Sequence, residues 1–317
     1  MQINKILSRT FISMLAGKRI IKKLFSIVSL FLMLIFYSCE KEITLDLPAV
    51  EKRIVIQGSI EQDQYPLVIV SMNSAYFSTV DSVALLNMIV KDAKVYVSCD
   101  TTTDTLSMTM IPYFPFFAYT GIRIKGEVGK MYNLTVITGG KTFSATTIIT
   151  PPDYLDTVYF KPTEPIKVNS SGDTLGYLWS RYSGDQTNVK YYRGYAQRIH
   201  QDDRFIPLLG SMFDGQFLTG QTISFYMSRG VENWYGEFTN EDREELGYFK
   251  VGDTVVLKIC TMDKVHYDFW KAVEKDLFSG GSPFGTPATI PTNISGGAIG
   301  IWGGFGSTYD TIYCKRY

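Results

Sequence analysis

Hydrophobic and polar residues alternate along most of the chain after residue 50, and this period of two is typical of β-strands. In the segment "KVYVSC", Val95, Val97 and Cys99 fall on one face of the expected strand. Short polar turns separate such segments, so we expect them to pair as antiparallel hairpins. The expected strands of this part are residues 53–60, 67–72, 93–99, 105–111, 131–138 and 142–149. Residues 51–150 are therefore predicted to form an N-terminal sandwich of immunoglobulin-like or transthyretin-like type.

A second strand-rich part follows Pro151 and Pro152. Prolines cannot continue a strand ladder and they stiffen a linker, so we place a domain boundary there. The expected strands beyond it are residues 156–160, 174–182, 189–199, 221–229, 254–262 and 311–314. The predicted fold of residues 153–317 is a C-terminal β-sandwich or partly open barrel with one short helix.

The segment 263–281 departs from the strand period. Hydrophobic residues recur there every four positions, which predicts an amphipathic helix. Asp263 is the expected N-cap and Gly280 the expected stop. A single-turn helix is expected within residues 240–247. The residues expected on the buried face of the long helix are Val265, Phe269, Val273 and Leu277.

The N-terminus has the pattern of an export signal. Residues 24–37 carry no charge, and they are too few to cross a bilayer, which takes about 20 residues. Four basic residues precede this apolar run and Ser38 follows it, as in a secretory signal peptide. We expect residues 1–38 to be a lipoprotein signal peptide, Cys39 to be acylated, and residues 39–50 to be a lipidated tether. The alternative for Cys39 is a buried thiol at the end of a core helix.

The acidic residues that follow the cysteine indicate on which side of the outer membrane the protein is anchored. Glu40 and Glu42 resemble the signal that places lipoproteins on the outer surface of the outer membrane. The alternative is an ordinary pair of solvated charges. Localisation at the outer membrane, lipid-anchored and exposed at the cell surface, is the resulting expectation.

Charge argues against a nucleic-acid partner. Six of the 31 basic residues and none of the 31 acidic ones lie in residues 1–38, so the remaining chain has a net charge of about −6. Phosphate backbones require a positive face. Cysteine is sparse: Cys99 is expected to be a buried hydrophobe, and a bridge between Cys260 and Cys314 is left open.

Catalytic and metal-binding patterns find little support in the sequence. The chain has two histidines and no Cys-x-x-Cys, His-Glu-x-x-His or Gly-x-Ser-x-Gly motif. His266 is interpreted as a surface or interface residue, and His200, near Asp202 and Asp203, as part of a polar loop. The carboxylates from Glu241 to Glu245 are expected to be exposed. We expect no catalytic residue, no metal site, no cofactor and no enzymatic activity.

Aromatic residues gather in "MIPYFPFFAYTG", where two prolines disfavour a central strand. Such side chains offer a large contact area for stacking on a sugar or for docking a partner. The alternative is that they cap the first sandwich or fill the seam between domains. The candidate contact residues are Tyr113, Phe114, Phe116, Phe117 and Tyr119. In "GGAIGIWGGFG" the glycines are expected to let backbone pack closely around Trp302 and Phe305.

Five segments, in this order, resemble one known family. They are "SCEKEITLDLP", "RIVIQGSI", "GEVGKMYNLTVITGGKTFSATTIITPP", "HYDFWKAVEKD" and "SPFGTPATIPTNISGGAIGIWGGFG". The family comprises the Bacteroidota lipoproteins that carry domain of unknown function 4249. The resemblance implies an outer-membrane lipoprotein, often encoded near a TonB-dependent transporter. It supplies no catalytic residue.

Together these features predict a lipid-anchored, non-catalytic accessory or binding protein. The expected partners are the membrane, through the lipid anchor, a TonB-dependent transporter in nutrient capture, and a glycan or peptide ligand. The main alternative is a surface structural or adhesion lipoprotein that works without a transporter. A hydrolase is the third alternative.

Overall fold

Strands make up most of the structure. The computed structural model describes residues 51–73, 82–112, 116–184, 190–217, 220–231, 239–279 and 289–316. The predicted signal peptide, Cys39, the tether, Tyr113 and Phe114 lie outside these residues. The described part confirms the predicted fold class, a mostly β protein built from sandwiches, and its sheets are not closed into a barrel.

The first sandwich is built by strands that include all six expected between residues 53 and 149. Its strands are β1 (Ile54–Glu61), β2 (Leu67–Met72), β3 (Lys94–Cys99), β4 (Thr102–Met110), β5 (Phe117–Thr120), β6 (Met131–Thr138) and β7 (Lys141–Ile148), and the helix α2 (Ser82–Asn87) follows β2. β4 belongs to both layers, because its first half pairs with β3 and its second half with β5. One layer is β1-β2-β5-β4 and the other β4-β3-β6-β7.

The second sandwich has one four-stranded layer and one layer that continues the first sheet. Its elements are β8 (Thr157–Pro162), β9 (Leu175–Ser183), β10 (Tyr191–Arg198), β11 (Ile206–Asp214), η1 (Gly215–Phe217), β12 (Thr222–Met227), α3 (Asn240–Glu244), β13 (Phe249–Lys250), β14 (Thr254–Met262), α4 (Lys264–Ser279) and β15 (Ile299–Tyr313). The strands β12, β9, β13 and β8 form one layer, and β11-β10-β14-β15 the other. Their facing side chains include Phe160, Leu178, Met227 and Leu257.

β15 connects the two sandwiches. Its first half runs parallel to β1, from the pair Val55 and Ile299 onward, and its second half runs antiparallel to β14. An eleven-stranded sheet results. The boundary at Pro151 and Pro152 stays a prediction, but the C-terminal strand contributes Trp302 to the hydrophobic core of the first sandwich.

The expected strand 311–314 covers only the last three residues of β15. The earlier part of β15 was not predicted, because the glycines of "GGAIGIWGGFG" lower the strand propensity of that segment. In the structure these glycines let β15 approach the backbone at the end of β7. A Cβ on Gly304 would lie 2.4 Å from the carbonyl oxygen of Ile148, and one on Gly306 would lie 2.0 Å from that of Thr150.

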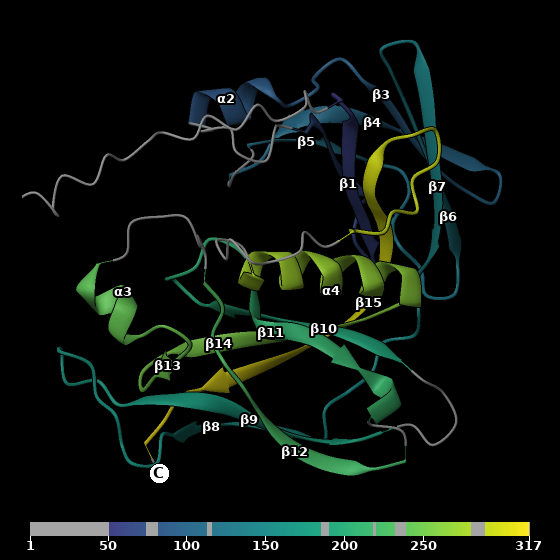
Figure 1. Cartoon of the computed structure of the whole chain (residues 1–317). Helices are drawn as coiled ribbons and strands as arrows, with labels where there is room; N and C mark the ends of the chain where they lie inside the picture. The colour runs from purple at the N-terminus through teal and green to yellow at the C-terminus, as the bar shows by residue number, and fades with distance from the viewer. Residues whose placement is uncertain are drawn as a thin grey trace, which may run out of the picture. The chain divides into compact units, whose positions relative to one another are not determined.

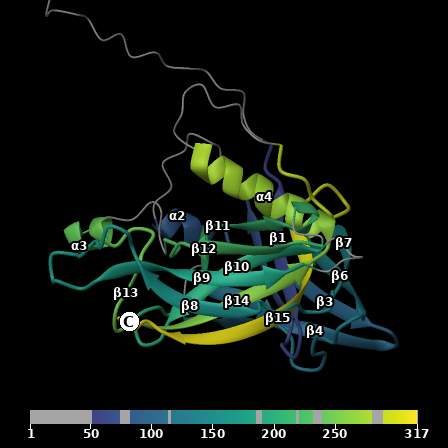
Figure 2. The same ribbon diagram turned by 90° about the horizontal axis from the view of Figure 1, so that it is seen from below.

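α4 covers the sheet face opposite β8, β9 and β12 (Figure 1), and Figure 2 shows the same layers from below. The N-cap prediction is confirmed, because Asp263 Oδ1 accepts a hydrogen bond from the backbone N–H of His266 at 2.8 Å. The predicted buried face is right for Phe269, which is buried, and wrong for Val265, which is 48% exposed, and Leu277, which is 41% exposed. His266 and Tyr267 are also buried, because the sheet beneath offers glycine and aromatic surface that accepts flat rings.

Candidate binding site

The aromatic residues proposed from the sequence are only partly described. Phe116 is 43% exposed and has a positive φ of 64°. Phe117 is half-buried in β5, with the Lys91 ammonium 4.2 Å from its ring centroid. Tyr119 lies in the core of the first sandwich, where its hydroxyl donates to the carbonyl of Val90 at 3.0 Å. The structure thus divides these rings between surface and core, and their role in contacting a ligand stays a prediction.

A larger aromatic site lies in the second sandwich and was not predicted. A cavity of about 440 Å³ opens between β11 and β12, beside η1 and α4. We name it the aromatic pocket. Its lining residues are Asp153, Tyr154, Leu155, Tyr182, Tyr192, Met212, Phe213, Asp214, Phe217, Ile223, Phe225, Tyr226, Ile259, Tyr267 and Lys271. An apolar chamber with a few charged groups is the usual form of a small-molecule site.

Asp153 is the polar centre of the aromatic pocket. Its Oδ2 accepts hydrogen bonds from the hydroxyls of Tyr192 at 2.8 Å and Tyr182 at 2.9 Å, and from Lys190 Nζ at 3.0 Å. Burial raises the pKa of Asp153, but hydrogen bonds from Tyr192, Lys190 and Tyr182 outweigh burial and leave the pKa below its usual value. The carboxylate is therefore ionised at neutral pH, and it can accept a further hydrogen bond from a ligand.

An open groove adjoins the aromatic pocket, and Tyr226 lines both. This aromatic groove is formed by residues 161–167 together with Tyr177, Trp179, Tyr226 and Tyr248. The Tyr226 ring lies 4.7 Å from Tyr177 and 5.7 Å from Trp179, between ring centroids. Burial and a hydrogen bond to Tyr248 raise the pKa of Tyr177 to about 12. Tyr226 is the one lining residue that the pocket and the groove share.

Sequence reasoning missed this site because its rings come from distant segments. Tyr182 and Tyr192 belong to neighbouring parts of the chain, whereas Tyr226 and Tyr267 follow much later. Each ring lies in a strand or helix whose local pattern predicts only burial. The sequence feature that could have indicated this site is the high density of Tyr and Phe in "YLWSRY", "SMFDGQF" and "ISFYM".

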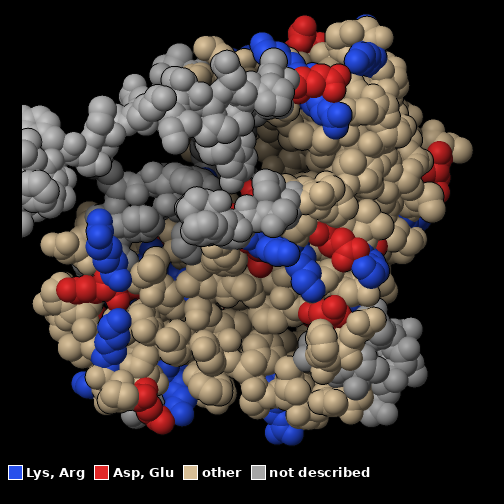
Figure 3. Space-filling view, in the orientation of Figure 1, with Lys and Arg blue, Asp and Glu red and all other residues tan. Residues whose placement is uncertain are grey.

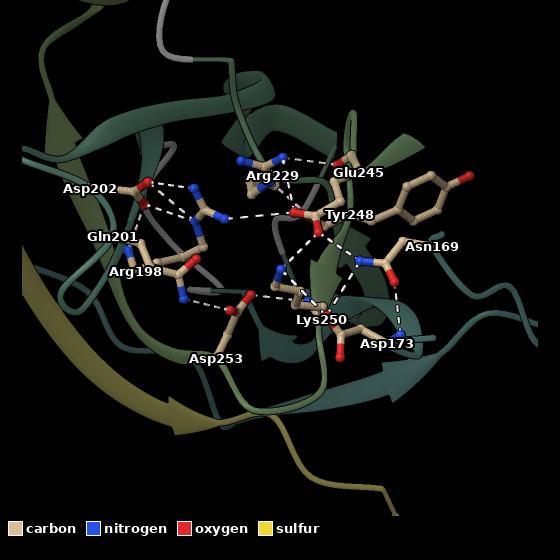
Figure 4. A network of polar contacts seen from close by, with 10 residues as sticks. All are labelled: Asn169, Asp173, Arg198, Gln201, Asp202, Arg229, Glu245, Tyr248, Lys250 and Asp253. Carbon is tan, nitrogen blue, oxygen red and sulfur yellow. Dashed lines mark hydrogen bonds and ion pairs between the residues drawn. The ribbon is translucent and has the colours of Figure 1, made fainter. Parts of the chain in front are cut away.

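A second polar cluster occupies one end of the second sandwich (Figure 4). Glu245 lies at its centre, where Oε1 accepts hydrogen bonds from Lys250 Nζ at 2.8 Å and Asn169 Nδ2 at 2.9 Å. Arg198 binds Asp202 through two nitrogens, with Nη2 2.8 Å from Oδ1. Arg229 donates to the backbone carbonyls of Tyr248 and Glu245. Charges of both signs are thus matched within the cluster, which indicates a structural role.

The cluster corrects one reading of the sequence. Glu245, expected in an exposed segment, is only 6% exposed. The residue is buried because its carboxylate neutralises two cations, Arg198 of β10 and Lys250 of β13. Asp202, near His200, is committed to Arg198 and is 9% exposed. His200 itself lies in a turn with a positive φ of 64°.

His266 is also placed differently from the expectation of a surface or interface residue. It is 1% exposed, in the seam between α4 and β15. A Cβ on Gly303 would lie 1.9 Å from His266 Cε1, so the imidazole rests directly on glycine backbone. Burial, helped by the positive charge of Arg193, lowers the pKa of His266 to about 3. The ring is therefore neutral.

The described cysteines are free thiols. Cys260 packs under α4, whereas Cys314 lies in the core of the second sandwich, on the opposite face of the sheet. No bridge joins them, which answers the question left open by the sequence. Cys99 is half-buried. In the described part of the chain, no three His, Cys, Asp or Glu side chains form a group that could hold a metal ion.

On the face drawn in Figure 3, basic and acidic side chains are interspersed among uncharged ones. Within the described residues, no helix combines the length and the apolar character needed to cross a bilayer.

The fold and the aromatic site define a β-sandwich protein with a preformed cavity. The chain belongs to the family named domain of unknown function (DUF4249), whose model matches residues 40–310. No curated protein matches the chain.

Proposed function

We propose that this protein is a lipid-anchored, non-catalytic binding protein of the outer membrane, and that the aromatic pocket and groove hold its ligand. The observation that carries the proposal is the chamber of about 440 Å³ walled by aromatic rings around the ionised Asp153. Aromatic faces bind the flat, weakly polar faces of a ligand, and one carboxylate orients its donors. A glycan or an aromatic peptide supplies both features.

The polar groups of the site favour binding over catalysis. Asp153 has a lowered pKa and accepts from three side-chain donors and from the backbone N–H of Tyr154, so it is a poor proton donor at neutral pH. The other acidic side chain in the lining, Asp214, accepts a hydrogen bond from the backbone N–H of Gln216 at 3.0 Å. A hydrolase would need a carboxyl group kept protonated or a base held near a nucleophile.

The anchor part of the proposal rests on the sequence. The uncharged run of residues 24–37 ends at Ser38 and Cys39, as in a Bacteroidota lipoprotein signal. More than one acyl chain on Cys39 would hold the protein on the bilayer, since each buried CH₂ contributes about 0.8 kcal/mol. In this position the site would collect nutrient for a TonB-dependent transporter, at the cell surface.

Ligand binding is tested by calorimetry on the detergent-purified protein, with a panel of oligosaccharides and tyrosine-containing peptides. We expect at least one class to bind, and Phe217→Ala and Tyr226→Ala to weaken that binding about tenfold or more. Tyr313→Ala is the matched control, because Tyr313 is 60% exposed and lines neither the pocket nor the groove. Equal affinity in all three variants would place the ligand elsewhere.

Location and partner need separate tests. Cys39→Ser should release the protein from membranes and remove the mass of the acyl chains. The wild-type protein should co-purify with a TonB-dependent transporter in mild detergent. Recovery only as a free monomer would count against the transporter, and a deletion strain with normal uptake but altered attachment would favour the structural or adhesion role.

A further inference from the structure

A separate cavity of about 300 Å³ lies in the seam where α4 and β10 meet β1 and β2. We name it the seam pocket. It shares no lining residue with the aromatic pocket or the aromatic groove. Its lining residues are Gln57, Gly58, Ser59, Leu67, Ile69, Arg193, Tyr195, Phe205, Pro207, His266, Trp270 and Phe305. The walls combine apolar side chains with a small set of polar ones, which is the pattern of a specific ligand site.

Arg193 brings a positive charge into the seam pocket. The residue is 6% exposed, and its guanidinium stacks on the Trp270 ring at 3.8 Å from the centroid. Its Nε donates a hydrogen bond to Ser211 Oγ at 3.3 Å. Among the described residues it forms no ion pair. The Ser211 hydroxyl in turn donates to Glu274, so this carboxylate reaches Arg193 only through that hydroxyl. A buried cation with no carboxylate in direct contact is costly, so this guanidinium is poised for an anion.

Two further polar atoms of the seam pocket are buried and lack a partner. They are Nδ1 of His266 and Nε1 of Trp270, neither of which has a hydrogen-bond partner among the described residues. On the other side of the imidazole, the ring N–H donates a hydrogen bond to the backbone of Gly304. His266 Nδ1 is therefore an acceptor, whereas Trp270 Nε1–H is a donor. Buried polar groups are satisfied in the great majority of cases, so both atoms point to a missing partner.

These three groups specify the chemistry of that partner. A cation and an indole N–H both favour a carboxylate, which accepts from each. The acceptor at His266 requires a hydroxyl donor, because an ammonium would be repelled by Arg193. Leu67, Ile69 and Phe305 supply apolar surface for a carbon skeleton. We propose that the seam pocket binds a small hydroxylated carboxylic acid, such as a sugar acid, with its carboxylate on Arg193 and Trp270 and a hydroxyl on His266.

The probes for calorimetry on the detergent-purified full-length protein are glucuronate, glucose, cyclohexanecarboxylate and inorganic phosphate. Glucuronate is expected to bind. Glucose lacks the carboxylate and cyclohexanecarboxylate lacks the hydroxyls, so each should bind at least tenfold more weakly. Phosphate binding as tight as that of glucuronate, or no binding of glucuronate, would overturn the proposal.

Variants test which atoms bind the probe. Arg193→Met should weaken glucuronate binding roughly 10- to 100-fold, and Trp270→Phe, which keeps the ring but removes the N–H, about tenfold. Arg181→Met is the matched control, because Arg181 is exposed on β9 and lines none of the three cavities. Retained affinity in Arg193→Met would refute the assignment.

Folding of the key variant has its own readout. Without ligand, Arg193→Met loses the stack on Trp270 and the hydrogen bond to Ser211, so its unfolding midpoint should fall modestly while the variant stays folded. If Arg193 were only structural, the variant would be less stable and would still bind glucuronate with wild-type affinity. That result would overturn the proposal.

Discussion

The indole Nε1–H of Trp302 donates a hydrogen bond to the backbone carbonyl of Tyr132 at 3.0 Å, although 170 residues separate the two. Trp302 is fully buried in the core of the first sandwich, and Gly58 makes room for its ring, since a Cβ there would lie 2.8 Å from Trp302 Cε3. The C-terminal strand is thus an integral part of the N-terminal core. The two halves of residues 50–317 are joined by shared side-chain packing as well as by the strand pairing of β1 with β15.

Replacing Trp302 should therefore destabilise the first sandwich. Trp302→Ala is expected to lower the free energy of unfolding by about 3–5 kcal/mol, because it removes a buried aromatic side chain and leaves a cavity. Trp302→Phe keeps most of the ring but loses the hydrogen bond, at a cost of about 1–2 kcal/mol. Urea unfolding measures both. Tyr313→Ala, at an exposed position of the same strand, should change stability by about 0.5 kcal/mol or less.

Gly303→Ala should be destabilising because of His266. The added methyl would overlap the imidazole, and overpacking of this kind costs about 1–3 kcal/mol. In a double-mutant cycle with His266→Ala, the second change removes the obstacle. The combined loss is then expected to be smaller than the sum of the single losses. Strict additivity would show that the two residues do not touch in solution.

Stability should fall with acid because His266 is buried and neutral. Its pKa is about 3 in the folded state, against about 6.5 when unfolded, so between these values only the unfolded chain takes up the proton. The resulting slope is at most about 1.4 kcal/mol per pH unit, and this histidine alone should cost about 2 kcal/mol between pH 7 and pH 5.

Urea unfolding at pH 5, 6 and 7 measures that slope. His266→Gln should flatten it by up to one proton. His200→Asn is the matched control, since asparagine tolerates the positive φ of that turn. The assignment fails if His266→Gln keeps the full pH dependence of the wild type.

Asp153 should stabilise the second sandwich through its three side-chain donors. Asp153→Asn leaves Lys190 facing an amide instead of a carboxylate, and we expect a loss of about 1–3 kcal/mol at pH 7. Because the folded pKa is below the usual value, the contribution of Asp153 is present above about pH 4 and is lost as the pH falls through the folded pKa. Denaturation curves at pH 7 and pH 3 test both statements.

The control for that carboxylate is Asp156→Asn. Asp156 is exposed and accepts one hydrogen bond, from Ser183 Oγ at 2.7 Å. Its replacement should cost about 0.5 kcal/mol or less. A similar loss from both variants would mean that the tyrosine and lysine donors around Asp153 contribute nothing specific.

Local pattern was sufficient for the strands of the first sandwich and for the start of α4. The segment 93–99 alternates, and β3 is Lys94–Cys99. The same reasoning failed where a residue's environment comes from elsewhere in the chain. Val265 is more hydrophobic than His266, yet His266 is the buried one because Gly303 leaves room for its ring.

The cavities could not be derived from the sequence for a similar reason. Arg193 and Trp270 belong to segments about eighty residues apart, and no local period places a guanidinium on an indole. Glu245 reads as solvent-exposed in "NEDREELG", and only the cations on other strands explain its burial. The burial and contacts of these side chains depend on partners from distant segments of the chain.

The order of strands in the eleven-stranded sheet has a consequence during synthesis. A chain made from its N-terminus exposes the edge of β1 until β15 arrives, since the partner of Ile56 in that ladder is Gly300. Ribosomes add residues one after another, so β1 lacks its partner strand until nearly the whole polypeptide has been synthesised. A nascent chain halted at residue 290 would leave this edge unprotected and prone to association with other chains.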